Sequence, residues 1–390
     1  MAEVTNVNTE IGFKQAATLL NSIVSQATGK TQLTPTNTAA FVSLAQTGLL
    51  TGYDPIMNAI STVLSKTIFS VRPYNARFRG LQRDAVQWGN HVRKINFGSK
   101  PVVNDDRFDL VDGQSVDMQT VNKADVLQTN FYSFDTYSNS YTVFRDQLNA
   151  AFQSPEEFSR FISGIVTEVS NKLEQYRENF ARMTMCNLIG STINLGRVRH
   201  LLTEYKEEFG LDDTTEILTT HMDSFTKWLF AQLRILSDRF EERSLLYQTN
   251  IVGHDIYRHT PKANQRLYIY SPFLAQVDAR VLSAVFNPGY LNIGKKEDVS
   301  FWQSIETPDE ISVTPNEIVP ATGAYATGDP VTAKVLGVLM DYEAAGITQV
   351  GEWSAPAPFN SRGGYQTTWY HASMRGWVDD TEKCVVLCLD

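Results

Sequence analysis

Residues 154–189 read SPEEFSRFISGIVTEVSNKLEQYRENFARMTMCNLI and carry the clearest helical pattern in the chain. The stretch starts like a helix, because Ser154 can cap, Pro155 suits the first helical position and Glu157 follows the cap by three residues. Apolar residues then recur at spacings of three and four, which predicts one helix with one apolar stripe. The stripe consists of Phe158, Phe161, Ile162, Ile165, Val166, Val169, Leu173, Tyr176, Phe180 and Met183.

This helix is expected to run to about Ile189, with Gly190 as its stop. At ~1.5 Å per residue it would be about 50 Å long, whereas the average globular helix has ~11 or 12 residues. A helix of that length acts as a beam across a whole domain. Its opposite face is expected to be solvated or to meet another subunit. That face carries Glu168, Lys172, Glu174, Arg177 and Glu178.

The other elements are predicted around this helix. They are a short helix at 11–26, a polar hairpin at about 96–132, amphipathic helices at 223–240 and 271–286, strands at 267–270, 299–304, 335–340, 366–371 and 383–389, and an exposed loop at 315–330. This mixture predicts an α+β fold. The predicted regions are an arm at 1–65, an extended loop region at 66–150, the long helix at 151–196, an α/β region at 197–330 and closing strands at 331–390.

The composition is that of a globular protein of 390 residues with 42% hydrophobic residues, 20% charged residues and a net charge of −9. It excludes disordered, collagen-like and coiled-coil proteins. Three cysteines are an odd number, which argues against a disulfide framework and favours a reducing compartment. We find neither a signal peptide nor a membrane span, so a cytoplasmic protein is expected. The acidic balance argues against nucleic-acid binding as the primary task.

The charge is unevenly distributed along the chain. Residues 66–98 carry seven cations and one anion, whereas residues 100–125 carry three cations and six anions. The hypothesis is that the acidic hairpin lies on an adjacent subunit and finds basic partners there. The candidate contacts are Arg77, Arg79, Arg83, Arg93, Lys94, Asp105, Asp106, Asp109 and Asp112. The basic run is also the best candidate for nucleic-acid contact, but pairing with carboxylates of the same or an adjacent subunit is favoured.

Motifs for catalysis or metal binding are missing from the sequence. Gly29-Lys30-Thr31 resembles the end of a phosphate loop, but Val24 stands where the first glycine is required. His254 and His259 do not share a helical face, and the acidic loop lacks the EF-hand spacing. Cys384 and Cys388 would share one face of a strand and are predicted to be small buried side chains. We therefore expect no catalytic residue, no cofactor and no metal.

The order of the elements resembles the major capsid proteins of tailed double-stranded DNA phages, which have the HK97-like fold. The resemblance is strongest to the major capsid proteins of short-tailed, phi29-like phages, and it covers residues 66–390. It rests on SFDTY at 133–137, TVFRDQL at 142–148, PEEF at 155–158, LYIYSP at 267–272, ARVLSAVFN at 279–287, VLMDY at 338–342, PFNSRGGY at 358–365 and TWYH at 368–371.

The resemblance implies an N-terminal arm, an extended β-hairpin loop, a spine helix, a peripheral domain and an axial domain. It implies a structural protein of the virion whose hexamers and pentamers build an icosahedral shell around packaged double-stranded DNA. The implied partners are a separate scaffolding protein, a portal protein and DNA bound without sequence specificity, with assembly in the host bacterial cytoplasm and no membrane. Two alternatives remain open: an encapsulin-type nanocompartment shell and an α/β enzyme with an unrecognised site.

Overall fold

The computed structural model describes residues 13–67, 78–83, 92–98, 111–113, 119, 126–132, 134–280 and 295–390. The helices are α1 (Phe13–Thr28), α2 (Thr38–Leu49), α3 (Tyr53–Thr67), α4 (Arg145–Ala151), α5 (Pro155–Asn194), α6 (Leu201–Phe209), α7 (Met222–Glu241) and α8 (Ser271–Arg280). The strands are β1 (Val92–Phe97), β2 (Val126–Phe131), β3 (Asp135–Phe144), β4 (Val198–His200), β5 (Gln265–Tyr270), β6 (Lys295–Val299), β7 (Glu310–Val313), β8 (Asn316–Ile318), β9 (Tyr325–Thr327), β10 (Val331–Asp341), β11 (Ala345–Pro356), β12 (Tyr365–Val378) and β13 (Cys384–Cys388).

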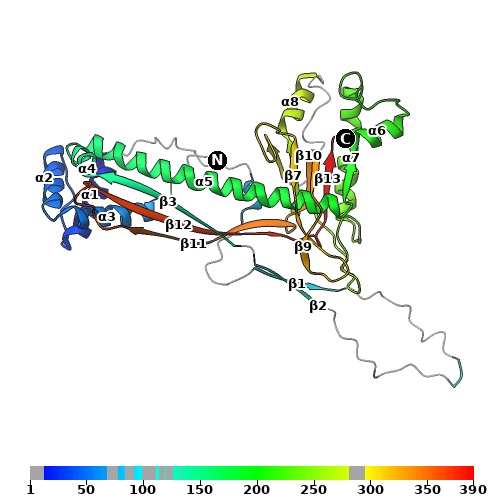
Figure 1. The fold of residues 1–390 in the computed structure, drawn as a ribbon, viewed down its shortest axis with the longest axis horizontal. Helices are drawn as coiled ribbons and strands as arrows, with labels where there is room; N and C mark the ends of the chain where they lie inside the picture. Colours follow the sequence, from blue (N-terminus) through cyan, green and yellow to red (C-terminus); the bar gives the residue numbers. More distant parts are fainter. Residues whose placement is uncertain are drawn as a thin grey trace.

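Helix α5 is the beam of the molecule. It has 40 residues, which at ~1.5 Å per residue makes it about 60 Å long. Figure 1 shows α5 lying lengthwise along the β3, β11 and β12 strands, with α1, α2 and α3 at one end and β7, β10 and β13 at the other. The paired strands β1 and β2 project from the body as a slender ribbon (Figure 1). The predicted beam is therefore confirmed.

The start of α5 is as predicted, and its end is not. The Ser154 side chain accepts a hydrogen bond from the Glu157 backbone N–H. The helix passes through Gly190 and ends at Asn194, and Gly196 has the left-handed φ of +73° that a helix terminus favours. Gly190 has a packing role, because a Cβ atom there would lie 2.8 Å from Val313 Cγ1.

Two glycines of α5 should therefore respond to alanine in opposite directions. A Cβ atom at Gly164 would meet nothing within 4 Å, so Gly164→Ala should raise the free energy of unfolding by ~0.5–1 kcal/mol through helix propensity. Gly190→Ala should lower it by about 1–3 kcal/mol, because Val313 and Pro315 would have to move. Chemical denaturation of unassembled subunits measures both values. Equal shifts in the two variants would contradict this account of Gly190.

The polar face of α5 is only partly open. Glu168 and Lys172 form an exposed pair, as predicted. Glu174 and Glu178 are buried and paired: Arg177 joins Glu174 to Glu352 of β11, and Arg182 pairs with Glu178. The expectation that this whole face is solvated or meets another subunit is wrong for these residues, since the subunit's own sheet covers part of it.

The three-stranded sheet has the order β11-β12-β3, with antiparallel pairing throughout. Side chains alternate along its strands. On β12, Tyr370, Ala372 and Met374 are buried, whereas Trp369 is 44% exposed. Trp353 of β11 lies on the same open face, where it stacks on His371 with ring centroids 4.0 Å apart.

The second sheet has the order β4-β13-β10-β5-β6, and β7 also pairs with β10. The predicted amphipathic helix is α7, and its apolar face is buried against this sheet and α8. Strands at 267–270, 335–340 and 383–389 are confirmed as β5, β10 and β13. Cys384 and Cys388 are buried in β13, as predicted.

Three predictions need correction. Residues 13–67 form three helices where one or two short ones are expected, and they share an apolar core with Phe158 and Ile162 of α5. The predicted loop at 315–330 contains β8 and β9, and Ile318 is buried. The strand predicted at 299–304 ends at Val299, where the chain leaves the sheet and buries Trp302.

The end of the predicted helix at 281–286 and the middle of the hairpin lie outside the described residues. None of the described helices combines the length and the apolarity of a membrane span.

Candidate functional site

The ribbon of β1 and β2 has two different faces, because side chains alternate along a strand. Lys94 and Asn96 lie on the face toward the body, and Asn96 is buried. Ile95 is 48% exposed, Phe97 is 68% exposed, and Val126, the partner of Phe97, is 51% exposed. These three residues form the apolar outer face of the ribbon.

Lys94 fastens the inner face of the ribbon to the body. Its Nζ atom lies 2.8 Å from Asp379 Oδ2 and 3.1 Å from Glu343 Oε2, and it also pairs with Glu382. Burial alone would lower the pKa of Lys94, but the charges of Asp379 and Glu382 outweigh burial and raise it. The ammonium is therefore held in its charged form among three carboxylates.

Arg258 adds a second link at the same place. Its Nη2 atom lies 3.1 Å from Glu382 Oε1 and donates to Asn96 Oδ1 at 2.9 Å. Glu382 is thus shared between a cation of the ribbon and a cation of the loop that follows α7. Burial raises the pKa of Glu382, while Lys94 and Arg258 favour its charged form.

Asp379 and Glu382 belong to one short connection, residues 379–383 between β12 and β13, which we call the junction turn, and Lys94 and Arg258 contact it. All five of its residues are buried. Asp380 pairs with Arg197 at 3.2 Å and accepts hydrogen bonds from Ser191 Oγ and the Ile318 N–H. Lys383 Nζ donates to the carbonyl oxygens of Phe240 and Glu242 at the end of α7.

The junction turn therefore ties together α5, α7, β8 and the ribbon. Burial lowers the pKa of Lys383 to about 8 and raises the pKa of Asp380. The pKa of Asp379 is lowered, because Lys94 and Thr381 outweigh the effect of its burial. These charges were missed in the sequence, where DDTEK at 379–383 looks like an ordinary polar connection. The signal that could have found them is a dense run of charged residues directly before the apolar strand β13.

Two of the candidate inter-subunit cations have their partners inside the subunit. Lys94 is one, as described above. Arg83 is the other: its guanidinium donates to the carbonyl oxygens of Gly80, Tyr342 and Ala345 and lies 3.4 Å from the centre of the Tyr342 ring. Burial lowers the pKa of Arg83. The structure gives these two residues contacts within the fold, and their contact with a neighbouring subunit stays a prediction.

Arg93 and Asp112 are the candidates that lie exposed on described parts of the chain. Arg93 is on the outer side of β1, next to the apolar outer face. Arg79 lies in a short helical turn (Arg79–Leu81), and its side chain is outside the described part of the structure. Arg77, Asp105, Asp106 and Asp109 also lie outside the described residues, so their contact role stays a prediction.

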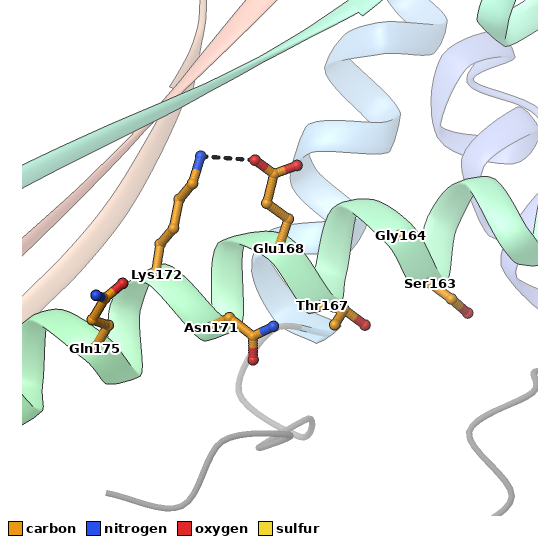
Figure 2. Close-up of a pocket in the computed structure, with 7 residues that line it drawn as sticks. All are labelled: Ser163, Gly164, Thr167, Glu168, Asn171, Lys172 and Gln175. Atoms are coloured by element: carbon orange, nitrogen blue, oxygen red, sulfur yellow. Dashed lines mark ion pairs between the residues drawn. The ribbon is translucent and has the colours of Figure 1, made fainter.

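Helix α5 exposes a polar stripe of its own. Figure 2 shows Ser163, Thr167 and Asn171 along one side of the helix, with the Glu168–Lys172 ion pair nearby. The depression at this stripe is shallow and is lined by side chains of a single helix (Figure 2). The Glu168–Lys172 pair is exposed to solvent, so the stripe resembles a solvated or contact surface more than an active site.

A groove of about 660 Å³ lies between the base of the ribbon and the body. Its lining includes Phe131, Phe180, Met183, Tyr325 and Trp377, so it is mainly apolar. Met183 is 58% exposed, although it belongs to the apolar stripe predicted for α5. Within the described ranges, no group of three or more His, Cys, Asp or Glu side chains is placed to hold a metal ion.

Comparison with known proteins points in one direction. A family model for the Phi29-like phage major capsid protein matches residues 20–388. A chain from the capsid structure of Staphylococcus phage Andhra is similar, with a TM-score of 0.54 and 11% identity, and the match covers 82% of this chain and 87% of that chain.

A second similar chain comes from the structure of the head fiber and inner core protein gp22 of native bacteriophage P68. Its TM-score is 0.51 and its identity is 11%, and the match covers 81% of this chain and 85% of that chain. At such identity the likeness shows the fold, which is the HK97-like fold of phage capsid structures. No curated protein sequence matches this chain.

Proposed function

The chain belongs to the Phi29-like phage major capsid protein family, and from that premise we propose how a single copy is used. It is a structural protein of the phage capsid, and copies of it form the shell. We propose that the copies assemble as hexamers and pentamers and that the icosahedral shell encloses packaged double-stranded DNA. We further propose that the chain has no enzymatic role.

The remaining partners also belong to this proposal. They are a separate scaffolding protein, a portal protein and DNA, which the inner face meets without sequence specificity. Assembly would take place in the host bacterial cytoplasm. The family match favours a phage capsid protein over the two alternatives, the encapsulin-type nanocompartment shell and the α/β enzyme. These partners are proposed because they suit a phage capsid protein.

The observation that carries the proposal is the apolar outer face of the ribbon. A two-stranded ribbon is marginally stable in water by itself. Here it also exposes Ile95, Phe97 and Val126, which face away from the body that holds its other side. A shell subunit meets copies of itself on several sides, so an adjacent copy is the surface against which we place this face.

A second surface suits the same use. The open face of the three-stranded sheet exposes Trp353 by 59% and Trp369 by 44%. Tryptophan is enriched where proteins bind each other, because it buries a large area at a small cost in side-chain entropy. We propose that this face also meets a neighbouring copy in the shell.

Charge reversal in the hairpin tests the proposed role of the ribbon. Changing Asp105, Asp106 and Asp109 together to Lys should block assembly while the subunit stays folded, because the acidic stretch would lose its basic partners on the adjacent copy. Electron microscopy of the purified protein counts closed shells, and circular dichroism checks the fold.

The control carries the same change in charge elsewhere. Glu207, Asp212 and Glu216 lie exposed on α6 and in the loop after it, and their joint change to Lys should leave shells at the wild-type level. Normal shells from the hairpin variant would contradict the proposed contact. Loss of shells in both variants would show that net charge, and not the hairpin, is responsible.

A further inference from the structure

The ribbon is held at the place where the two sheets of the subunit meet. Strand β10 ends at Asp341 in one sheet and β11 begins at Ala345 in the other. Strand β12 likewise ends at Val378 and β13 begins at Cys384. These two short connections between the sheets pass through this small region, whereas the third connection runs from β3 through α4 and α5 to β4.

Lys94 contacts both of these connections at once. Glu343 belongs to the connection between β10 and β11, and Asp379 and Glu382 belong to the junction turn. One ammonium of the ribbon thus bridges the two short connections between the sheets. The ribbon is therefore attached to the body where these two connections lie side by side.

We propose that Lys94 is a positioning residue that fixes the direction of the ribbon relative to the two sheets and thereby allows the ribbon to reach a neighbouring copy. The part that concerns the neighbour rests on the proposed function. The part that concerns the direction of the ribbon does not, because every contact in the argument lies within one subunit.

Loss of the ammonium changes the balance of charge at this site. In Lys94→Met, Asp379, Glu382 and Glu343 face one another with Arg258 as the neighbouring cation. Asp379 and Glu382 are buried, and like charges repel strongly in a poorly solvated place, so the ribbon base should shift or sample several directions. Asn96 and Phe131 still contact the body, so the strands are expected to stay paired.

The direction of the ribbon can be measured in unassembled subunits. Spin labels at Gln128→Cys on β2 and Arg234→Cys on α7 occupy exposed sites, and the three native cysteines are buried. Distances between the labels should form one narrow distribution in the wild type and in Lys94→Arg. They should be broadened or shifted in Lys94→Met. An unchanged distribution in Lys94→Met overturns the proposal.

A compensated variant separates positioning from stability. Lys94→Met combined with Asp379→Asn restores the net charge of the cluster without restoring the ammonium. Lys94→Met alone should lower thermal stability. The double variant should be more stable than Lys94→Met, while its distance distribution stays broad. A narrow distribution in this double variant would show that charge balance and not the Lys94 link sets the direction, and would overturn the proposal.

Shell assembly is the second readout. Closed shells should fall by about tenfold or more in Lys94→Met and in the double variant, because a ribbon that points elsewhere cannot engage its partner, and they should recover in Lys94→Arg. Altered distances with normal shells would leave the positioning role intact and contradict the proposed contact with a neighbour. The two parts of the argument can therefore fail separately.

Discussion

Asp380→Asn is expected to lower the free energy of unfolding by about 3–5 kcal/mol, because it breaks a buried ion pair and leaves one charge without its partner. Asp380 is fully buried, and Arg197, whose side chain is 6% exposed, lies 3.2 Å away. The variant keeps the shape of the side chain, so the loss reports charge and not volume. Chemical denaturation of unassembled subunits measures it.

The matched control is an ion pair on the surface of α5. Glu168 and Lys172 lie 2.8 Å apart, which is closer than the Asp380 pair, but their side chains are 64% and 48% exposed. Glu168→Gln should change stability by less than about 1 kcal/mol, because solvent screens the pair. Equal losses in the two variants would show that burial does not decide the strength of these pairs.

The elements that the sequence predicts well are those with long, regular patterns. Helix α5 shows its period over ten apolar positions, and a cap and a proline mark its start at Ser154. Its end could not be found in this way, because Gly190 and Gly196 look alike in sequence. They differ in what surrounds them, since Gly190 packs against Val313 and Gly196 adopts a left-handed φ.

The first 65 residues show the opposite case. Their short apolar stretches are separated by Thr, Asn and Gly, so they suggest an arm with little core. In the structure, Leu20 of α1, Phe41 of α2 and Ile56 of α3 are fully buried together with Phe158 of α5. The partner that makes these helices a unit lies more than one hundred residues away, where local patterns cannot reveal it.

The candidate contacts were only partly predictable for a related reason. Alternation along β1 separates Lys94 from Arg93, but it does not say which of the two faces the body. That depends on the junction turn, which lies nearly three hundred residues later in the chain. A count of charge along the sequence could detect the basic run, but it could not divide it into internal pairs and exposed cations.

Trp302→Ala is expected to lower the free energy of unfolding by about 3–5 kcal/mol, because it empties a large space in the core. Trp302 is fully buried where α5 meets β10. Its Nε1–H donates to the Val335 carbonyl oxygen at 2.7 Å, and its own carbonyl accepts from Arg182 of α5. Loss of the ring should loosen the beam from the second sheet, and denaturation of unassembled subunits measures the change.

A phenylalanine at position 302 separates the volume of the Trp302 ring from its hydrogen bond. Trp302→Phe keeps most of the apolar volume but removes the donor to Val335, so it should lose about 1–3 kcal/mol of stability, less than Trp302→Ala.

Trp353→Ala makes the same change as Trp302→Ala on a residue that is 59% exposed, and it should alter stability by less than about 1 kcal/mol. If Trp353 meets a neighbouring copy, its variant should reduce the yield of closed shells while the subunit keeps its stability. A large loss of stability in Trp353→Ala would instead make the open face of the sheet part of the core and remove it as an assembly surface.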